Sequence, residues 1–282
     1  GAFFGIGSIV AASVVAPDKR AGAVAAMFLG LTLATIGGVP LATWFGENFG
    51  WRTAFWGISG LGAFVMVALW WALPNTPAPK GGSLMAEIRV LGRGPVPAGL
   101  ALTGVGSSAM FTVFTYIAPI LRDVTHASTN FVTGMLVLFG IGLTLGNVWG
   151  GRSADRSVDR TLITSLVVLI AVLLAFSVLM QWPLPAALSI LLWGAASFAL
   201  VPPLQMRVME AAKDAPNLAS AMNIGAFNFG NAIGAALGGA VINAGLGYPA
   251  ISLAGAIMAA LGLLMVLGLG WRSRRVGSRT CR

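Results

Sequence analysis

Seven side chains of this 282-residue chain could contact a small solute, because each places a polar or aromatic group inside an otherwise apolar segment. An amide or hydroxyl without a partner is costly in hydrocarbon, so such groups face either a cavity or a neighbouring helix. Asn228 and Asn231 are three residues apart and share one face of a helix. The candidates for binding a solute are Thr115, Tyr116, Gln205, Asn223, Phe227, Asn228 and Asn231. Hydrogen bonding between helices is the alternative for the polar residues among them.

The sequence offers no arrangement of residues for catalysis. His126 is the one histidine and Cys281 the one cysteine, which predicts neither a metal site nor a His/Cys nucleophile pair. No acidic residue lies near the middle of an apolar segment, and the phosphate-binding pattern Gly-x4-Gly-Lys-Ser/Thr is missing. We therefore expect no enzyme and no bound cofactor.

A short charged stretch forms the second group of candidates, which are Gly151, Arg152, Asp155, Arg156 and Arg160. The stretch lies between two apolar segments, so it must lie at one face of a membrane. An aspartate placed there can accept hydrogen bonds from the N-terminus of a neighbouring helix, where the helix dipole is positive. The arginines can pair with carboxylates of adjacent helices. The alternative is plain anchoring at the membrane face, with solvated ion pairs worth about 0–1 kcal/mol each.

The rest of the chain supplies long apolar helices to position these groups. Hydrophobic residues make up 57% of the chain and charged residues only 9%, whereas soluble proteins carry about 25% charged residues. A helix needs roughly 20 apolar residues to cross a bilayer. The uncharged runs and the turns between them predict an all-α membrane protein with about nine spans: 1–16, 21–45, 52–73, 97–120, 131–151, 161–181, 185–209, 217–245 and 249–271.

The domain organisation follows from one long connection, residues 74–96, which is rich in proline, glycine and charge. It separates three spans in residues 1–73 from six spans in residues 97–271, and a basic tail follows at 272–282.

An internal repeat adds to this division, because residues 21–51 align with residues 219–248, with similar flanking turns. Six-span repeats nested as three plus three are typical of transporters. A complete repeat would have three further spans before Gly1, so we expect the chain to begin inside a longer protein.

The distribution of basic residues predicts the orientation. Of the 17 Lys and Arg residues, only Arg52 and Arg122 fall on one set of alternate loops, and the others fall on the opposite set and the tail. Because basic loops stay in the cytoplasm, we expect the linker and the C-terminus to be cytoplasmic. The net charge of +9 is explained by the same loops, so we expect no nucleic-acid partner.

Three stretches carry a resemblance to a known family. They are Gly151-Arg152-Ser153-Ala154-Asp155-Arg156 with the later Arg160, then Gly30-x6-Gly37-Gly38-Val39-Pro40-x5-Gly46, and finally Gly50-Trp51-Arg52-Thr53-Ala54-Phe55-Trp56. Together they resemble the major facilitator superfamily, in its drug and sugar efflux branch of proton antiporters of the arabinose-efflux type. The glycine pattern departs from the antiporter signature at Ala42 and Thr43, where further glycine is expected.

The resemblance implies that the nine spans are helices four to twelve of a twelve-helix fold. It makes Gly151, Arg152, Asp155, Arg156 and Arg160 a cytoplasmic gate. It also makes the segment with Gly30, Gly37, Gly38, Pro40 and Gly46 a tightly packed helix that seals the outer side, since small residues let membrane helices approach closely.

The implied function is export of a small drug, sugar or nucleoside-like solute by alternating access, coupled to protons as an antiporter. A passive facilitator on the same fold is the main alternative, and a membrane-embedded sensor or enzyme is a more distant one. Proton coupling usually needs a titratable group at membrane depth, and the resemblance places such a group in the first helix of the family. The expected setting is the bacterial inner membrane, where the protein would be a multi-pass monomer with the lipid bilayer, protons and its solute as partners.

Overall fold

The structure is a computed structural model, and it describes residues 2–38, 41, 45–46, 49–72, 89–90, 92 and 94–277. The regular elements in these residues are all helical, which confirms the predicted fold class. Two short elements flank the second helix, the 3-10 turn Pro17–Lys19 and the π-helical turn Ala34–Gly38. The α-helices are α1 (Ala2–Ser13), α2 (Arg20–Leu33), α4 (Trp51–Ala72), α6 (Pro95–Phe114), α7 (Ile117–Asp123), α8 (Thr129–Arg156), α9 (Val158–Leu179), α10 (Pro183–Phe198), α11 (Val201–Ala211), α12 (Pro216–Asn243) and α13 (Gly247–Gly277).

Eight helical segments in the described residues are long and apolar enough to cross a membrane. They correspond to the second to ninth predicted spans. The first predicted span, residues 1–16, contains α1, a shorter apolar helix of 12 residues. The predicted linker 74–96 falls largely outside the described residues, and α6 already begins at Pro95. Helix α13 continues to Gly277, so helical backbone extends into the predicted tail.

Two of the spans are broken by proline. Helix α6 ends at Phe114, and α7 begins at Ile117, because Pro119 has no N–H to donate to the carbonyl of Thr115. Helix α10 ends at Phe198 for the same reason, since Pro202 and Pro203 interrupt the backbone ladder before α11.

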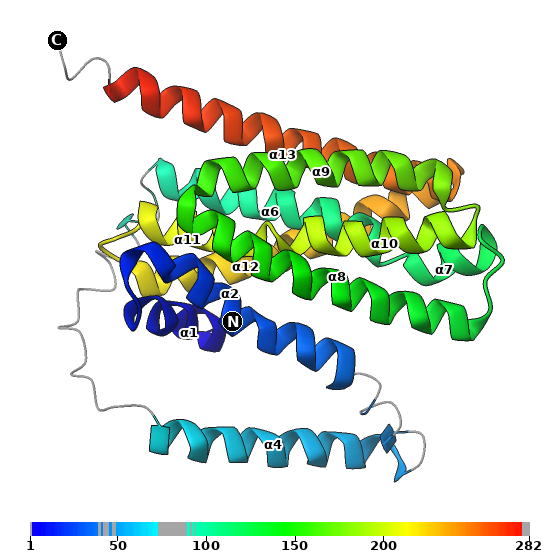
Figure 1. Cartoon of the computed structure of the whole chain (residues 1–282), viewed down its shortest axis with the longest axis horizontal. Helices are drawn as coiled ribbons and strands as arrows, with labels where there is room; N and C mark the ends of the chain where they lie inside the picture. Colours follow the sequence, from blue (N-terminus) through cyan, green and yellow to red (C-terminus); the bar gives the residue numbers. More distant parts are fainter. Residues whose placement is uncertain are drawn as a thin grey trace.

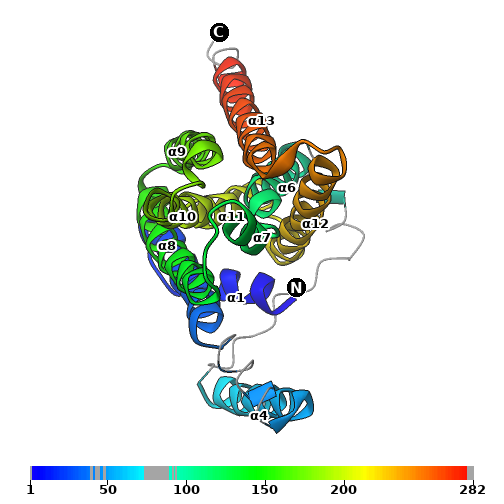
Figure 2. The same cartoon turned by 90° about the vertical axis from the view of Figure 1, so that its right-hand side faces the viewer.

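Helices α6 to α13 form a bundle with α9 and α13 on one side and α8 on another (Figures 1 and 2). Its core surrounds Trp193, which is buried against Phe139 and Phe176. Glycines let some helix pairs approach closely. A Cβ atom at Gly150 of α8 would lie 2.5 Å from the Ala199 carbonyl oxygen, and a Cβ atom at Gly234 of α12 would lie 2.5 Å from that of Ser108.

Helices α1 and α2 pack against this bundle, α2 along α8 and α1 along α12. Helix α4 lies apart from the other helices in both views (Figures 1 and 2). Its large apolar side chains are exposed, with Trp70 and Trp71 at 86% and 90% of full accessibility. Such a surface is suited to contact with lipid rather than water.

Candidate functional site

A cavity of about 470 Å³ lies where α1 and α2 meet α6, α8, α10, α11 and α12. Seven phenylalanines contribute to its wall, and they come from both sides of the contact. Among the described residues that line it, four are polar and none is charged. The lining residues are Phe4, Phe28, Leu31, Gly106, Ser107, Met110, Phe111, Phe114, Phe139, Leu143, Ser197, Phe198, Leu200, Val201, Leu204, Ile224, Phe227, Asn228 and Asn231.

The aromatic rings form two groups. Phe4 of α1 stacks on Phe28 of α2, with ring centroids 5.7 Å apart and planes inclined by 16°. Across the cavity, Phe114 stacks on Phe139 at 5.2 Å, and Phe111 meets Phe114 edge-on at 5.3 Å. Both geometries are favourable for aromatic pairs. The cavity therefore has flat apolar walls on two sides.

Three of the predicted solute contacts line this cavity, namely Phe227, Asn228 and Asn231. The amide nitrogen of Asn228 donates to the Ile224 carbonyl at 2.9 Å. The side-chain oxygen of Asn231 is buried and has no hydrogen-bond partner among the described residues. The predicted shared helical face of these two asparagines is therefore the face that α12 turns to the cavity.

The other four predicted contacts lie elsewhere. Thr115 is exposed, and its hydroxyl donates to the Phe111 carbonyl of its own helix. The Tyr116 hydroxyl donates to the Ala235 carbonyl at 2.9 Å, which ties the break between α6 and α7 to α12. Gln205 and Asn223 are fully buried and bind each other. None of these four lines the cavity, and their contact with a solute stays a prediction.

Gln205 is the centre of a buried polar cluster that joins four helices. Its side-chain nitrogen donates to the hydroxyls of Ser8 (3.0 Å) and Ser220, and its oxygen accepts a 2.6 Å bond from Asn223. The Asn223 oxygen accepts a 2.7 Å bond from Thr103. All five side chains are fully buried. The amide side chains of Gln205 and Asn223 thus find their hydrogen-bond partners on neighbouring helices. Hydrogen bonding between helices was the alternative to solute contact that the sequence left open.

Asp155 joins α8 to α2. Its two carboxylate oxygens accept hydrogen bonds from the backbone N–H groups of Ala21 (2.7 Å) and Gly22 (3.0 Å). Both amides belong to the first turn of α2, which has no side-chain cap of its own. The predicted contact between an aspartate and the positive end of a neighbouring helix is therefore present, with α2 as the partner.

Two further contacts hold α8 and α2 together. A Cβ atom at Gly151 would lie 3.0 Å from the Ala21 carbonyl oxygen and closer still to the Ala25 methyl group, so the helices touch there. The Asn147 side chain, fully buried one turn away, donates to the Ala25 carbonyl at 2.6 Å. Asp155, Gly151 and Asn147 make up one face of α8, which we call the α8 contact face.

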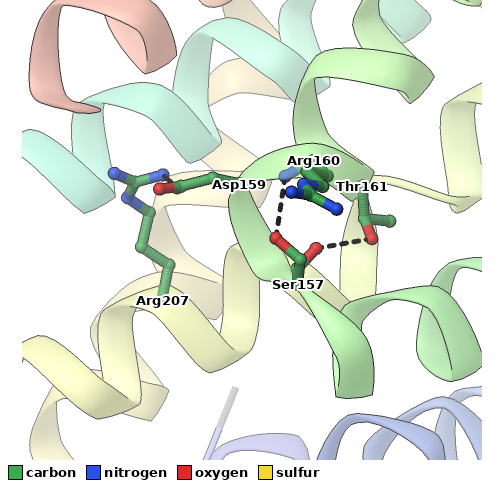
Figure 3. Close-up of polar contacts among 5 residues, drawn as sticks. All are labelled: Ser157, Asp159, Arg160, Thr161 and Arg207. Atoms are coloured by element: carbon green, nitrogen blue, oxygen red, sulfur yellow. Dashed lines mark hydrogen bonds and ion pairs between the residues drawn. The ribbon is translucent and has the colours of Figure 1, made fainter. Parts of the chain in front are cut away.

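The predicted ion pairs of the arginines in the charged stretch are not found among the described residues. Arg152, Arg156 and Arg160 are exposed, and in the part of the chain that the structure describes none of them pairs with a carboxylate. The ion pair found nearby joins Asp159 to Arg207 of α11 at 2.7 Å (Figure 3). Figure 3 also shows Ser157, which caps α9 by accepting a hydrogen bond from the Arg160 backbone N–H.

Comparison with known proteins agrees with this geometry. The sequence profile of the Major Facilitator Superfamily matches residues 1–239 and 100–280. The inner membrane transport protein YdhP of Escherichia coli K12 is 55% identical over 266 residues, which cover 94% of this chain and 68% of YdhP. The putative transporter AraJ of E. coli K12 is 32% identical, covering 95% and 69%. A probable sugar efflux transporter of Helicobacter pylori 26695 is also 32% identical, covering 95% and 67%.

The chain belongs to the Major Facilitator Superfamily. It is a multi-pass membrane transporter and not an enzyme, and its relatives include proteins named as efflux transporters. The predicted resemblance to the efflux branch of the family is thereby confirmed.

The glycine-rich segment that resembles the antiporter signature of this family is open in the structure. A Cβ atom at Gly30, Gly37, Gly38 or Gly46 would meet no other atom within 4 Å in the described residues. Pro40 lies outside the described residues. The predicted close packing at these glycines is therefore not seen here, and their proposed sealing function stays a prediction.

Sequence reasoning missed several residues of the cavity. Ser107 and Ser197 are polar residues inside apolar spans, the same signal that selected the asparagines. Phe4 and Phe28 could not be selected from the sequence, because a phenylalanine in an apolar helix looks the same whether it faces lipid or a cavity.

A second hollow of about 540 Å³ lies between α6, α12 and α13. Its walls are almost entirely apolar.

Proposed function

We propose that this protein exports a small organic solute by alternating access, as a secondary active transporter coupled to protons. The observations that carry the proposal are the apolar cavity where α1 and α2 meet the bundle and the contact between Asp155 and the start of α2. That contact is in the first turn of α2, and the cluster around Gln205 includes Ser220 and Asn223 near the start of α12. We infer that they close one end of the cavity and separate when residues 1–73 and residues 97–271 rock against each other.

The strength of the Asp155 contact suits a reversible gate. Hydrogen bonds to a charged group contribute about 1.5–3 kcal/mol each, and a charge at a helix N-terminus adds about 0.3–1 kcal/mol. Two alternating states of a protein usually differ by a few kcal/mol. A bound solute or a proton can therefore shift the balance between the closed and the open gate.

The distribution of basic residues supports a cytoplasmic position for this end. Lys19, Arg20, Arg160, Arg207 and Lys213 lie beside the turns that precede α2, α9 and α12 or follow α11. By the positive-inside rule these turns face the cytoplasm of a bacterial inner membrane. The arrangement would then be closed on the cytoplasmic side. We propose a monomer, because the cavity is built from helices of one chain.

Proton coupling can be tested in inside-out membrane vesicles from cells that express the protein as its gene encodes it. Labelled arabinose, thymidine and 2-naphthol represent a sugar, a nucleoside and an aromatic solute. We expect uptake of one of them above the level of vesicles without the protein, and loss of that uptake when a protonophore collapses the pH gradient. Accumulation that survives the protonophore would exclude proton antiport.

A passive facilitator is the second candidate, and one observation favours it. The spans of this sequence carry no acidic residue and no histidine near their middle, whereas proton relays in membranes use such groups. A facilitator would equilibrate the solute but never concentrate it. The vesicle experiment separates the two functions, because only an antiporter raises the internal concentration above the external one.

A further inference from the structure

We propose that Arg152 and Arg156 of α8 bind the phosphate of an anionic phospholipid headgroup, with Trp149 beside them at the membrane interface. The inference goes beyond the proposed function and does not depend on it, because it concerns lipid binding and not transport. It gives a role to two arginines whose predicted ion pairs are not found among the described residues.

One exposed stripe runs along α8 and ends in the two arginines. Ile141, Leu145 and Trp149 are 43%, 57% and 46% exposed, and Arg152 and Arg156 are exposed as well. Steps of three and four residues keep all five side chains on one side of the helix. Because α8 is long and apolar enough to cross a membrane, we infer that this exposed apolar stripe contacts lipid.

The other sides of α8 are occupied by neighbouring helices. Gly150 packs against the backbone at Ala199, where α10 ends. Both carboxylate oxygens of Asp155 accept hydrogen bonds from the start of α2, so this carboxylate is directed to α2 and not to the guanidinium groups of Arg152 and Arg156. The two arginines therefore keep their donors for a partner on the lipid side.

The length of α8 places the arginines at the depth of the headgroups. The helix has 28 residues, or about 42 Å at 1.5 Å per residue, whereas a bilayer is about 30 Å thick in its hydrocarbon core and about 40–45 Å with its headgroups. Trp149 lies about two turns before the end of the helix, and tryptophan is enriched at the interface between hydrocarbon and headgroups. Arg152 and Arg156 follow in the headgroup layer.

The chemistry of this layer fits the two side chains. A guanidinium group can donate two parallel hydrogen bonds to a phosphate, and residues four apart on a helix can reach the same group. The turn Pro17–Lys19 contacts α8, and it adds the exposed Lys19 and Arg20 from the other side of the long linker. Such a basic surface attracts anionic lipids.

The positive-inside rule does not by itself explain this arrangement. It requires basic residues in the loop between two spans, but it does not require them to continue a lipid-facing stripe directly after a tryptophan. The nearby Arg207 differs in this respect, because it forms an ion pair with Asp159.

Lipid binding can be measured on the purified protein, in the form its gene encodes, after removal of lipid in a non-ionic detergent. Native mass spectrometry gives the dissociation constant of the first bound lipid. Dioleoyl phosphatidylglycerol and dioleoyl phosphatidylcholine are matched probes, because they share their chains and a phosphate but only the first carries a net negative charge. We expect phosphatidylglycerol to bind about ten-fold more tightly. Equal affinities would overturn the inference.

A double variant locates the site. Arg152→Gln with Arg156→Gln should lower the affinity for phosphatidylglycerol at least about ten-fold. Arg122→Gln with Lys213→Gln is the charge-matched control, because it also removes two exposed cations, but neither lies on α8. An equal loss in both double variants, or no loss in the first, would refute the assignment to α8. The two lipids test the native protein even where a variant does not fold.

Glycerol 1-phosphate separates a lipid site from a site for soluble phosphate. It carries the phosphate but lacks the acyl chains that would lie along Ile141 and Leu145, so it should displace phosphatidylglycerol only weakly. Displacement as effective as that by the lipid itself would assign the site to a soluble phosphate and overturn the proposed occupant. Preference for phosphatidylglycerol without solute transport would leave this inference standing while the proposed function fails, and transport without that preference would do the reverse.

Discussion

The carboxylate of Asp155 on α8 accepts a 2.7 Å hydrogen bond from the backbone N–H of Ala21, in the first turn of α2. These residues are 134 positions apart in the chain. The bond therefore joins two spans that the sequence places on opposite sides of the long linker. It also gives α2 the negative cap that its own sequence does not provide.

Replacing Asp155 with asparagine should impair transport and leave membrane insertion intact. An amide has a single acceptor oxygen and no charge, so one N–H group at the start of α2 loses its partner and the interaction with the helix dipole disappears. We expect the transport rate to fall at least about ten-fold, which corresponds to about 1.4 kcal/mol. Uptake into inside-out vesicles, normalised to the amount of protein in the membrane, measures the effect.

Asp159→Asn is the control for this prediction. The Asp159 side chain is 55% exposed and its ion pair with Arg207 lies at the surface, where such pairs contribute about 0–1 kcal/mol. We expect this variant to keep nearly full transport. An Asp155→Asn variant as active as Asp159→Asn would reduce the charged stretch to a membrane anchor.

A methyl group at Gly151 should push α2 away from the α8 contact face. The added Cβ atom would lie 3.0 Å from the Ala21 carbonyl oxygen and would collide with the Ala25 methyl group. Overpacking of this kind costs about 1–3 kcal/mol, so Gly151→Ala should lower the thermal unfolding midpoint in detergent. Gly134→Ala on the same helix is the matched control, because a Cβ atom there meets nothing within 4 Å. Equal midpoints for both variants would show that the two helices do not touch at Gly151 in solution.

The spans could be predicted from the sequence because the bilayer imposes their length and polarity on each helix separately. The contact of Asp155 with a helix N-terminus could be predicted for a similar reason, since the partner is a general property of helix ends. That the helix is α2 could not be predicted, because it depends on how distant segments pack.

Predicting which polar groups face the cavity was less successful, because it requires the rotation of each helix about its axis. Asn228 and Asn231 turn toward the cavity, whereas Asn223, on the same helix, turns toward Gln205. All three are amides in an apolar segment, so their composition and spacing give no reason to separate them. The breaks at Pro119 and Pro202 add a further change of direction that periodicity cannot follow.

Loss of the Gln205 amide should destabilise the polar cluster as a whole. In Gln205→Leu the side chains of Ser8, Ser220 and Asn223 keep their burial but lose their shared partner. An unsatisfied buried polar group costs about 1–3 kcal/mol, so the unfolding midpoint should fall clearly. Gln181→Leu, at an exposed turn, should leave it unchanged.

A double-mutant cycle with Asn223→Leu tests whether the cluster acts as a unit. Because Gln205 and Asn223 bond directly at 2.6 Å, the second substitution should cost much less in the Gln205→Leu background than in the native protein. Additive losses would mean that the two amides are stabilised independently, which would contradict the hydrogen bond between them.

The single cysteine of the chain allows the orientation to be tested without any substitution. Cys281 lies in the basic C-terminal tail, and the positive-inside rule places that tail in the cytoplasm. A membrane-impermeant maleimide should therefore label the protein in inside-out vesicles and leave it unlabelled in intact spheroplasts. Cys281→Ser should remove the signal from both preparations, which controls for reaction with other proteins. Labelling in spheroplasts alone would reverse the orientation, and the end of the cavity closed by Asp155 would then face the outside.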